Sequence, residues 1–130
     1  MPNTDKIEDG RAHHAFEAAQ AAEEEGGCVA VDYQSYAKDL PMRIKTNGLG
    51  SALAFIKAKD ARAYDLLYQD IGDWLTTNER AYLLDGAEGD DLVEQIVSLD
   101  STAYRAVTRE VLAYLSWLRR FAEGLIDSNE

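Results

Sequence analysis

Basic side chains gather in two segments of an otherwise acidic chain. Six of its 13 lysines and arginines lie between Lys38 and Arg62, where Asp39 and Asp60 are the only acids. A second group near the C-terminus has a single acid, Glu110, and four arginines: Arg105, Arg109, Arg119 and Arg120. Lysine and arginine bind phosphate groups, so the two segments are candidates for contact with a nucleic-acid backbone.

The charge of the whole chain points the other way. The formal net charge is −11, which argues against free, non-specific binding to nucleic acid or to an anionic membrane. Binding nevertheless responds to the local field rather than to the total charge. The decisive question is therefore whether the two basic segments share one surface of the folded chain.

Other chemistry is sparse in the sequence. His13 and His14 are neighbours, and on a helix they point about 100° apart, so they cannot chelate one metal ion together. The pattern favours a solvated histidine pair; a weak metal site with Glu17 is the alternative. Cys28 has no base nearby in the sequence and is predicted to be buried or half-buried. The acidic loop 85–91 lacks the ligand order of a calcium-binding hand. We expect no catalytic residue, no metal site and no cofactor.

The single cysteine excludes an internal disulfide and fits a reducing compartment. No apolar stretch approaches the roughly 18 residues of a membrane span, and the N-terminus lacks a basic segment followed by an apolar one. The sequence therefore predicts a cytoplasmic protein that does not enter a membrane.

Hydrophobic periodicity predicts an all-α protein, a single compact domain over residues 1–130 with about five to seven helices. A helix within 1–27 has a thin apolar face and is predicted to be peripheral. A break or kink is expected near Asp39–Leu40, just before Pro41. The expected helices are 5–25, 35–46, 49–59, 61–75, 92–99 and a long C-terminal helix of 101–126, with a short turn or helix over 76–84.

The long C-terminal helix has two different sides. Its apolar residues fall on one side at 100° per residue: Val107, Val111, Tyr114, Leu118, Phe121 and Leu125. The four arginines fall on the opposite side, within an arc of about 100°. This face is either the ordinary charged side of an amphipathic helix, held by salt bridges, or a phosphate-binding surface.

Two segments together resemble a known family. The first runs from Tyr36 to Phe55, contains Leu40-Pro41 and Ile44-Lys45-Thr46-Asn47-Gly48-Leu49, and is followed by Leu67, Tyr68, Ile71, Trp74 and Leu75. The second contains Asp100, Ser101, Tyr104, Arg105, Thr108, Glu110, Leu112 and Leu115, then Trp117-Leu118-Arg119-Arg120-Phe121-Ala122-Glu123-Gly124. Their order and spacing resemble the small helical subunit of the type III-B CRISPR effector, the Cmr RNA-silencing complex. The resemblance covers about residues 33–126.

The resemblance implies a non-catalytic, RNA-binding subunit that works in antiviral defence. Its partners would be the backbone subunit, the large subunit, other copies of itself, and the guide and target RNA. Several copies would stack along the guide-RNA filament and contact the RNA backbone. The matched positions that would meet RNA are Lys38, Arg43, Lys45, Lys57, Arg105, Arg109, Arg119 and Arg120.

An alternative from another functional class remains open at this point. The arginine face would then dock an acidic protein partner, and the chain would be a helical adaptor that does not touch RNA. Charge reversal of Lys45 and Arg109 to glutamate separates the two hypotheses. It would weaken target-RNA binding and leave assembly intact in an RNA-binding subunit, whereas loss of assembly with RNA binding otherwise unaffected would favour the adaptor.

Overall fold

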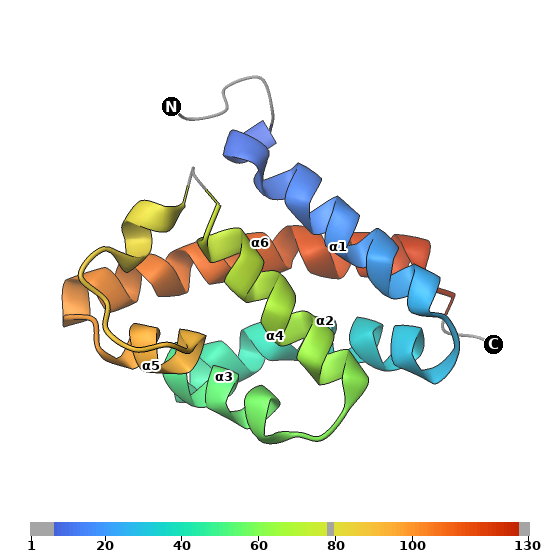
Figure 1. Ribbon diagram of the computed structural model, residues 1–130. Coiled ribbons are helices and arrows are strands. Elements are labelled where there is room, and N and C mark those ends of the chain that lie inside the picture. The colour runs from blue at the N-terminus through green and yellow to red at the C-terminus, as the bar shows by residue number, and fades with distance from the viewer. Residues whose placement is uncertain (1–6, 78–79, 128–130) are drawn as a thin grey trace.

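The computed structural model describes residues 7–77 and 80–127, and within them every regular element is a helix (Figure 1). The elements are η1 (Ile7–Gly10), α1 (Arg11–Glu25), α2 (Gly27–Asn47), α3 (Leu49–Ala58), α4 (Arg62–Leu75), η2 (Ala81–Leu84), α5 (Leu92–Val97) and α6 (Ser101–Leu125). All six α-helices of these described ranges contribute side chains to one apolar core. The predicted all-α, single-domain architecture with a long C-terminal helix is confirmed. No helix in these residues is long and apolar enough to cross a membrane.

The long helix α6 organises the domain. Its N-cap is Asp100, whose carboxylate accepts a hydrogen bond from the backbone N–H of Ala103 at 2.8 Å. Val107, Val111 and Leu118 are completely buried, as the periodicity predicted. In Figure 1, α1 lies along the C-terminal half of α6 while α4 crosses the middle of the molecule. The apolar side weakens toward the C-terminus, where Leu125 is 37% exposed.

Helix α1 is an integral layer of the domain, which corrects the prediction of a peripheral helix within 1–27. It buries five alanines along one side: Ala12, Ala15, Ala18, Ala19 and Ala22. Side chains at the contact set how closely two helices approach, so a stripe of alanines lets α1 lie near α6. The apolar face of α1 contains few large side chains because its contact with α6 is made by closely packed alanines.

Helix α2 is longer than the sequence predicted. It begins at Gly27, directly after the turn at Gly26, and continues through Pro41 without a break. Proline removes one backbone hydrogen bond and can cost about 3 kcal/mol inside a helix. Both halves of α2 are anchored in the core, and this anchoring offsets the loss. The anchoring side chains are Ala30, Tyr33, Ala37, Leu40 and Ile44.

A single glycine, Gly48, makes the turn between α2 and α3. Gly48 has a φ of 91°, which L side chains rarely adopt, and it ends one helix and starts the next. Helices α3 and α4 agree with the predicted ranges to within one residue. The short element η2 lies within the segment 76–84, of which residues 78–79 fall outside the described part.

Candidate nucleic-acid interface

Helices α2 and α6 lie antiparallel, and hydrogen bonds at both ends fix their register. The side-chain amide of Gln34, near the start of α2, donates to the carbonyls of Ala122 and Ile126 at 3.2 and 2.9 Å. Beyond the other end of α2, the backbone N–H of Gly50 donates to the hydroxyl of Tyr104 at 2.8 Å. Basic residues on the adjoining edges of these helices are therefore brought close together.

Lys38 lines a groove along this contact, and Arg119 pairs with Glu123, another residue of the same groove. The groove is lined by Val31, Gln34, Ser35, Lys38 and Glu123. Arg119 lies one turn before Glu123, and its Nε is 3.8 Å from the Glu123 carboxylate. Both cations are exposed, and they come from different basic segments of the sequence. The two segments meet at this point of the fold.

Lys45 and Arg105 continue the same line toward the other end of the helices. Lys45 follows Lys38 by seven residues, or about two turns, and so lies on the same side of α2. Arg105 precedes Arg119 by 14 residues, or about four turns, and lies within about 40° of it around α6. Because the helices are antiparallel, Lys45 and Arg105 share one end of the contact. We call these four exposed residues the α2–α6 seam: Lys38, Lys45, Arg105 and Arg119.

Arg109 and Arg120 lie farther around the solvent side of α6. They are about 40° and 60° from Arg105 around the helix axis, away from α2. Both are exposed. They widen the positive surface beside the seam without bordering α2.

Arg43 and Lys57 do not join this surface. The eight candidate residues therefore do not all lie on one face of the folded chain. The Arg43 guanidinium carbon lies 3.7 Å from the centre of the Phe55 ring, on the side of α2 that faces α3. Lys57 Nζ lies 2.6 Å from a carboxylate oxygen of Asp91, the N-cap residue of α5. The acidic loop therefore neutralises one of the predicted cations.

The sequence analysis did not predict that Glu110 is buried, and in the structure it lies at the contact between α1 and α6. Its two carboxylate oxygens accept hydrogen bonds from Arg11 at 2.7 and 2.9 Å and from the indole N–H of Trp74 at 2.9 Å. Arg80 Nε lies 2.9 Å from the same carboxylate. In the sequence, Glu110 lies one helical turn before Tyr114 and directly before Val111. Its position at the edge of the apolar side of α6 is the one sequence feature that indicates its burial.

This cluster shows why a buried carboxylate stays charged. Burial acts to raise the pKa of Glu110, but the hydrogen bonds from Arg11 and Trp74 and the charges of Arg11 and Arg80 hold it below its ordinary value. The hydrogen bond that Arg11 donates to Glu110 raises the pKa of Arg11 in return. The cluster ties α1, α4 and α6 together and is structural rather than catalytic in its geometry.

The remaining polar interior also departs from the sequence predictions. His14 is half-buried rather than solvated; its Nδ1 lies 2.8 Å from the hydroxyl of Tyr114, and burial lowers its pKa. Asp70 accepts a 2.5 Å hydrogen bond from the hydroxyl of Tyr33. Burial raises the pKa of Asp70 to about 6. Cys28 is exposed, not buried.

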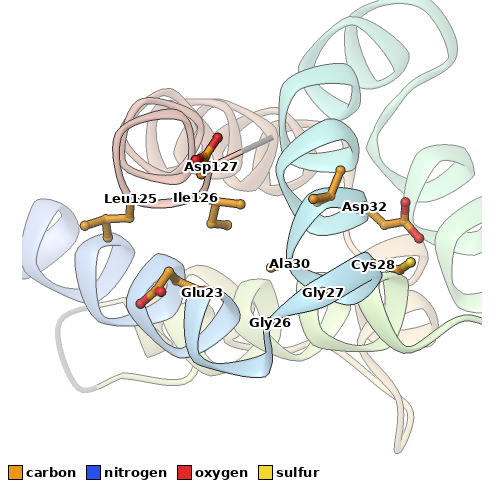
Figure 2. A pocket seen from close by; sticks show the side chains of 10 residues that line it. Glu23, Gly26, Gly27, Cys28, Ala30, Asp32, Leu125, Ile126 and Asp127 are labelled. Atoms are coloured by element: carbon orange, nitrogen blue, oxygen red, sulfur yellow. The ribbon is translucent and has the colours of Figure 1, made fainter. Parts of the chain in front are cut away.

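No group of three or more metal-ligating side chains converges within residues 7–77 and 80–127. Figure 2 shows a cleft of about 490 Å³ between the α1–α2 corner and the end of α6. Three acids line it (Glu23, Asp32 and Asp127), and none of its lining residues is basic. Such a cleft repels phosphate, so the seam is the better candidate for contact with nucleic acid.

A scan against protein families matches residues 7–125 to the family described as "CRISPR-associated protein (Cas_Cmr5)". A curated protein of Thermus thermophilus, the "CRISPR system Cmr subunit Cmr5", is 32% identical over 117 residues. This alignment covers 89% of the present chain and 92% of the relative. The chain belongs to the Cas_Cmr5 family. It is thus a CRISPR-associated protein, and the resemblance in the sequence is confirmed.

The fold agrees with that of a solved Cas_Cmr5 protein. The crystal structure of a CRISPR-associated Cmr5 family protein from Thermus thermophilus matches with a TM-score of 0.74 and 28% sequence identity. The match covers 92% of the present chain and 96% of the other. The family match begins at residue 7 and so includes α1, which lay outside the 33–126 range of the sequence resemblance.

Proposed function

We propose that this Cas_Cmr5 protein is the non-catalytic small subunit of a type III-B Cmr effector complex in the cytoplasm. In this proposal several copies stack along the guide-RNA filament beside the backbone and large subunits and serve antiviral defence. The family match over residues 7–125 supports it, as does the Thermus relative, whose name makes it a Cmr subunit.

The α2–α6 seam is proposed to contact the RNA backbone, with Arg109 and Arg120 beside it. The observation that carries this proposal is that two basic segments, far apart in the sequence, adjoin along two antiparallel helices. Arg105 and Arg119 are separated by about 21 Å along α6 at 1.5 Å per residue, a length that spans several phosphates of an RNA strand. Such contacts are independent of sequence, which suits a complex whose guide RNA supplies the specificity.

The acidic remainder of the surface fits the same role. Negative charge around the seam repels RNA from the free subunit, so the seam acts only where neighbouring subunits hold the RNA in place. The free protein should therefore bind duplex RNA weakly at physiological salt. Tight binding of duplex RNA by the isolated chain would contradict this part of the proposal.

Charge reversal in the reconstituted complex tests the proposal. Lys45→Glu combined with Arg109→Glu should weaken target-RNA binding while the complex still assembles. For every phosphate that the variant no longer binds, the slope of log affinity against log salt should fall by about 0.7–0.9. The matched control is Arg62→Glu, which reverses an exposed arginine on α4, away from the seam.

The pattern of losses distinguishes the two hypotheses. Failure to assemble, together with unchanged RNA binding by the complexes that do form, would support the adaptor that docks an acidic partner. Equal losses per reversed charge for the Lys45→Glu, Arg109→Glu variant and for Arg62→Glu would show that the effect is one of net charge, and this surface would not be the contact.

A further inference from the structure

A second cationic surface lies on the other side of α2, where three aromatic rings meet. The rings of Tyr36 and Tyr64 stack with their centres 3.7 Å apart and an angle of 8° between their planes. Phe55 meets Tyr64 edge-on, with 6.0 Å between ring centres. Arg43 and Lys59 lie over the Phe55 ring, at 3.7 and 4.6 Å from its centre. We call these five residues the aromatic–cation cluster.

The two cations of this cluster share one ring, and no ion pair among the described residues includes either of them. An aromatic face attracts a cation but does not neutralise its charge. The cluster therefore places two cations beside one ring in a strongly acidic protein, with the carboxylate of Asp39 in the adjoining groove. A phosphate group placed beside it would gain from both charges.

A shallow groove of about 330 Å³ adjoins Arg43 on α2. It is lined by Asp39, Met42, Arg43, Thr46 and Asn47. Met42 is 67% exposed and offers an apolar contact, while the other side chains offer hydrogen-bond donors and acceptors. Arg43 thus takes part in both features, because its guanidinium carbon lies over the Phe55 ring and the residue also lines the groove.

We propose that the aromatic–cation cluster binds one unpaired RNA nucleotide, whose base enters the groove and stacks on the Arg43 guanidinium. Lys59 meets a phosphate of the same strand, and Thr46 or Asn47 hydrogen-bonds an edge of the base. The inference rests on the proposed RNA contact but uses a different surface and a different mode of recognition. The seam holds backbone phosphates, whereas this site requires a base.

The composition of the site favours unpaired RNA over a protein partner. Surfaces that bind single strands combine cations with aromatic or guanidinium planes, because every base has a face on which to stack. A duplex keeps its bases stacked inside the helix and offers this site only phosphates. An acidic peptide can pair with Arg43 and Lys59 through its carboxylates, but it does not stack on the face of the guanidinium.

A comparison of Arg43→Lys with the native protein isolates the planar group, since lysine keeps the charge but cannot stack as a plane. The probes are a labelled oligoadenylate and an abasic oligomer of the same length, titrated at low ionic strength against the full chain. Arg43→Lys should bind oligoadenylate about fivefold or more weakly, the effect of losing one stacked base. It should bind the abasic oligomer as the native protein does. Arg62→Lys, the control at an exposed arginine that belongs to neither surface, should change neither affinity more than about twofold.

Thermal melting of each variant establishes that it is folded. Equal affinity of Arg43→Lys and native protein for oligoadenylate would overturn the inference. An equal loss toward both oligomers would overturn it too, because the contact would then be to phosphate alone. The outcome is separable from that of the proposed function, since the Lys45 and Arg109 reversals are measured on a different surface in the assembled complex.

Discussion

Removing the charge of Glu110 should cost more stability than any surface substitution on α6. In Glu110→Gln, the carboxylate is replaced by an amide whose nitrogen donates and cannot accept. The native carboxylate accepts three hydrogen bonds from Arg11 and Trp74 and forms an ion pair with Arg80 Nε, all at distances of 2.7–2.9 Å. At least one donor loses its acceptor, and Arg11 and Arg80 lose their ion pairs with Glu110, while Arg11 keeps its ion pair with Glu8.

The burial of the partners sets the magnitude. The side chains of Glu110, Arg11 and Arg80 are only 9%, 16% and 8% exposed, so water cannot replace the lost interactions. Breaking a buried ion pair by removing one partner costs about 3–5 kcal/mol. This is a large part of the roughly 5–15 kcal/mol that typically stabilises a domain. For a chain of this length the melting temperature should fall by roughly 11–18 °C.

Urea denaturation followed by circular dichroism measures this effect directly. Glu123→Gln is the matched control, because Glu123 is 49% exposed and its ion pair among the described residues is the 3.8 Å approach to Arg119. The control should change the free energy of unfolding by less than about 0.5 kcal/mol. If Glu110→Gln unfolds within about 1 kcal/mol of the native protein, the cluster does not hold α1 and α4 to α6 as described.

Two further substitutions test other parts of the fold. Asp70→Asn should become more stable relative to the native protein as pH rises from about 4 to 6, by up to about 3 kcal/mol, because burial raises the pKa of Asp70 from 3.8 to about 6. The neutral form of Asp70 stabilises the native state below about pH 4, and that contribution is lost as the carboxyl ionises; a pH-independent difference in urea midpoints would contradict this. Asp100→Ala should lower the free energy of unfolding by about 1 kcal/mol through loss of the α6 N-cap, whereas Asp100→Asn should retain most of it. Equal midpoints for the alanine and asparagine variants would show that the cap contributes nothing.

The sequence predicted elements better than it predicted which face of each element is buried. Helix periodicity located α3, α4 and α6 well, because their apolar side chains recur at a fixed spacing. Lys45 and Arg43 are two residues apart and project about 160° from each other, so only one can face α6. Which one does depends on how α2 packs, and that information lies in the tertiary structure.

Ion pairs between residues far apart in the chain could not be predicted from the sequence for the same reason. Lys57 pairs with Asp91 on a distant element, and Arg11 is separated from Glu110 by 99 residues. Nothing local links either pair. Some basic residues that the sequence offers as RNA contacts, such as Lys57, therefore form ion pairs within the fold. The candidate RNA surface contains fewer residues than the charge pattern of the sequence predicted.

The most direct test of the central claim is the salt dependence of target-RNA binding by the assembled complex. The variant carries glutamine at all four seam positions, Lys38, Lys45, Arg105 and Arg119, so that charge is removed without being reversed. The account predicts normal assembly, weaker binding, and a slope of log affinity against log salt that falls by about 0.7–0.9 for each phosphate no longer bound. Normal assembly with an unchanged slope would contradict the claim that the α2–α6 seam contacts the RNA backbone.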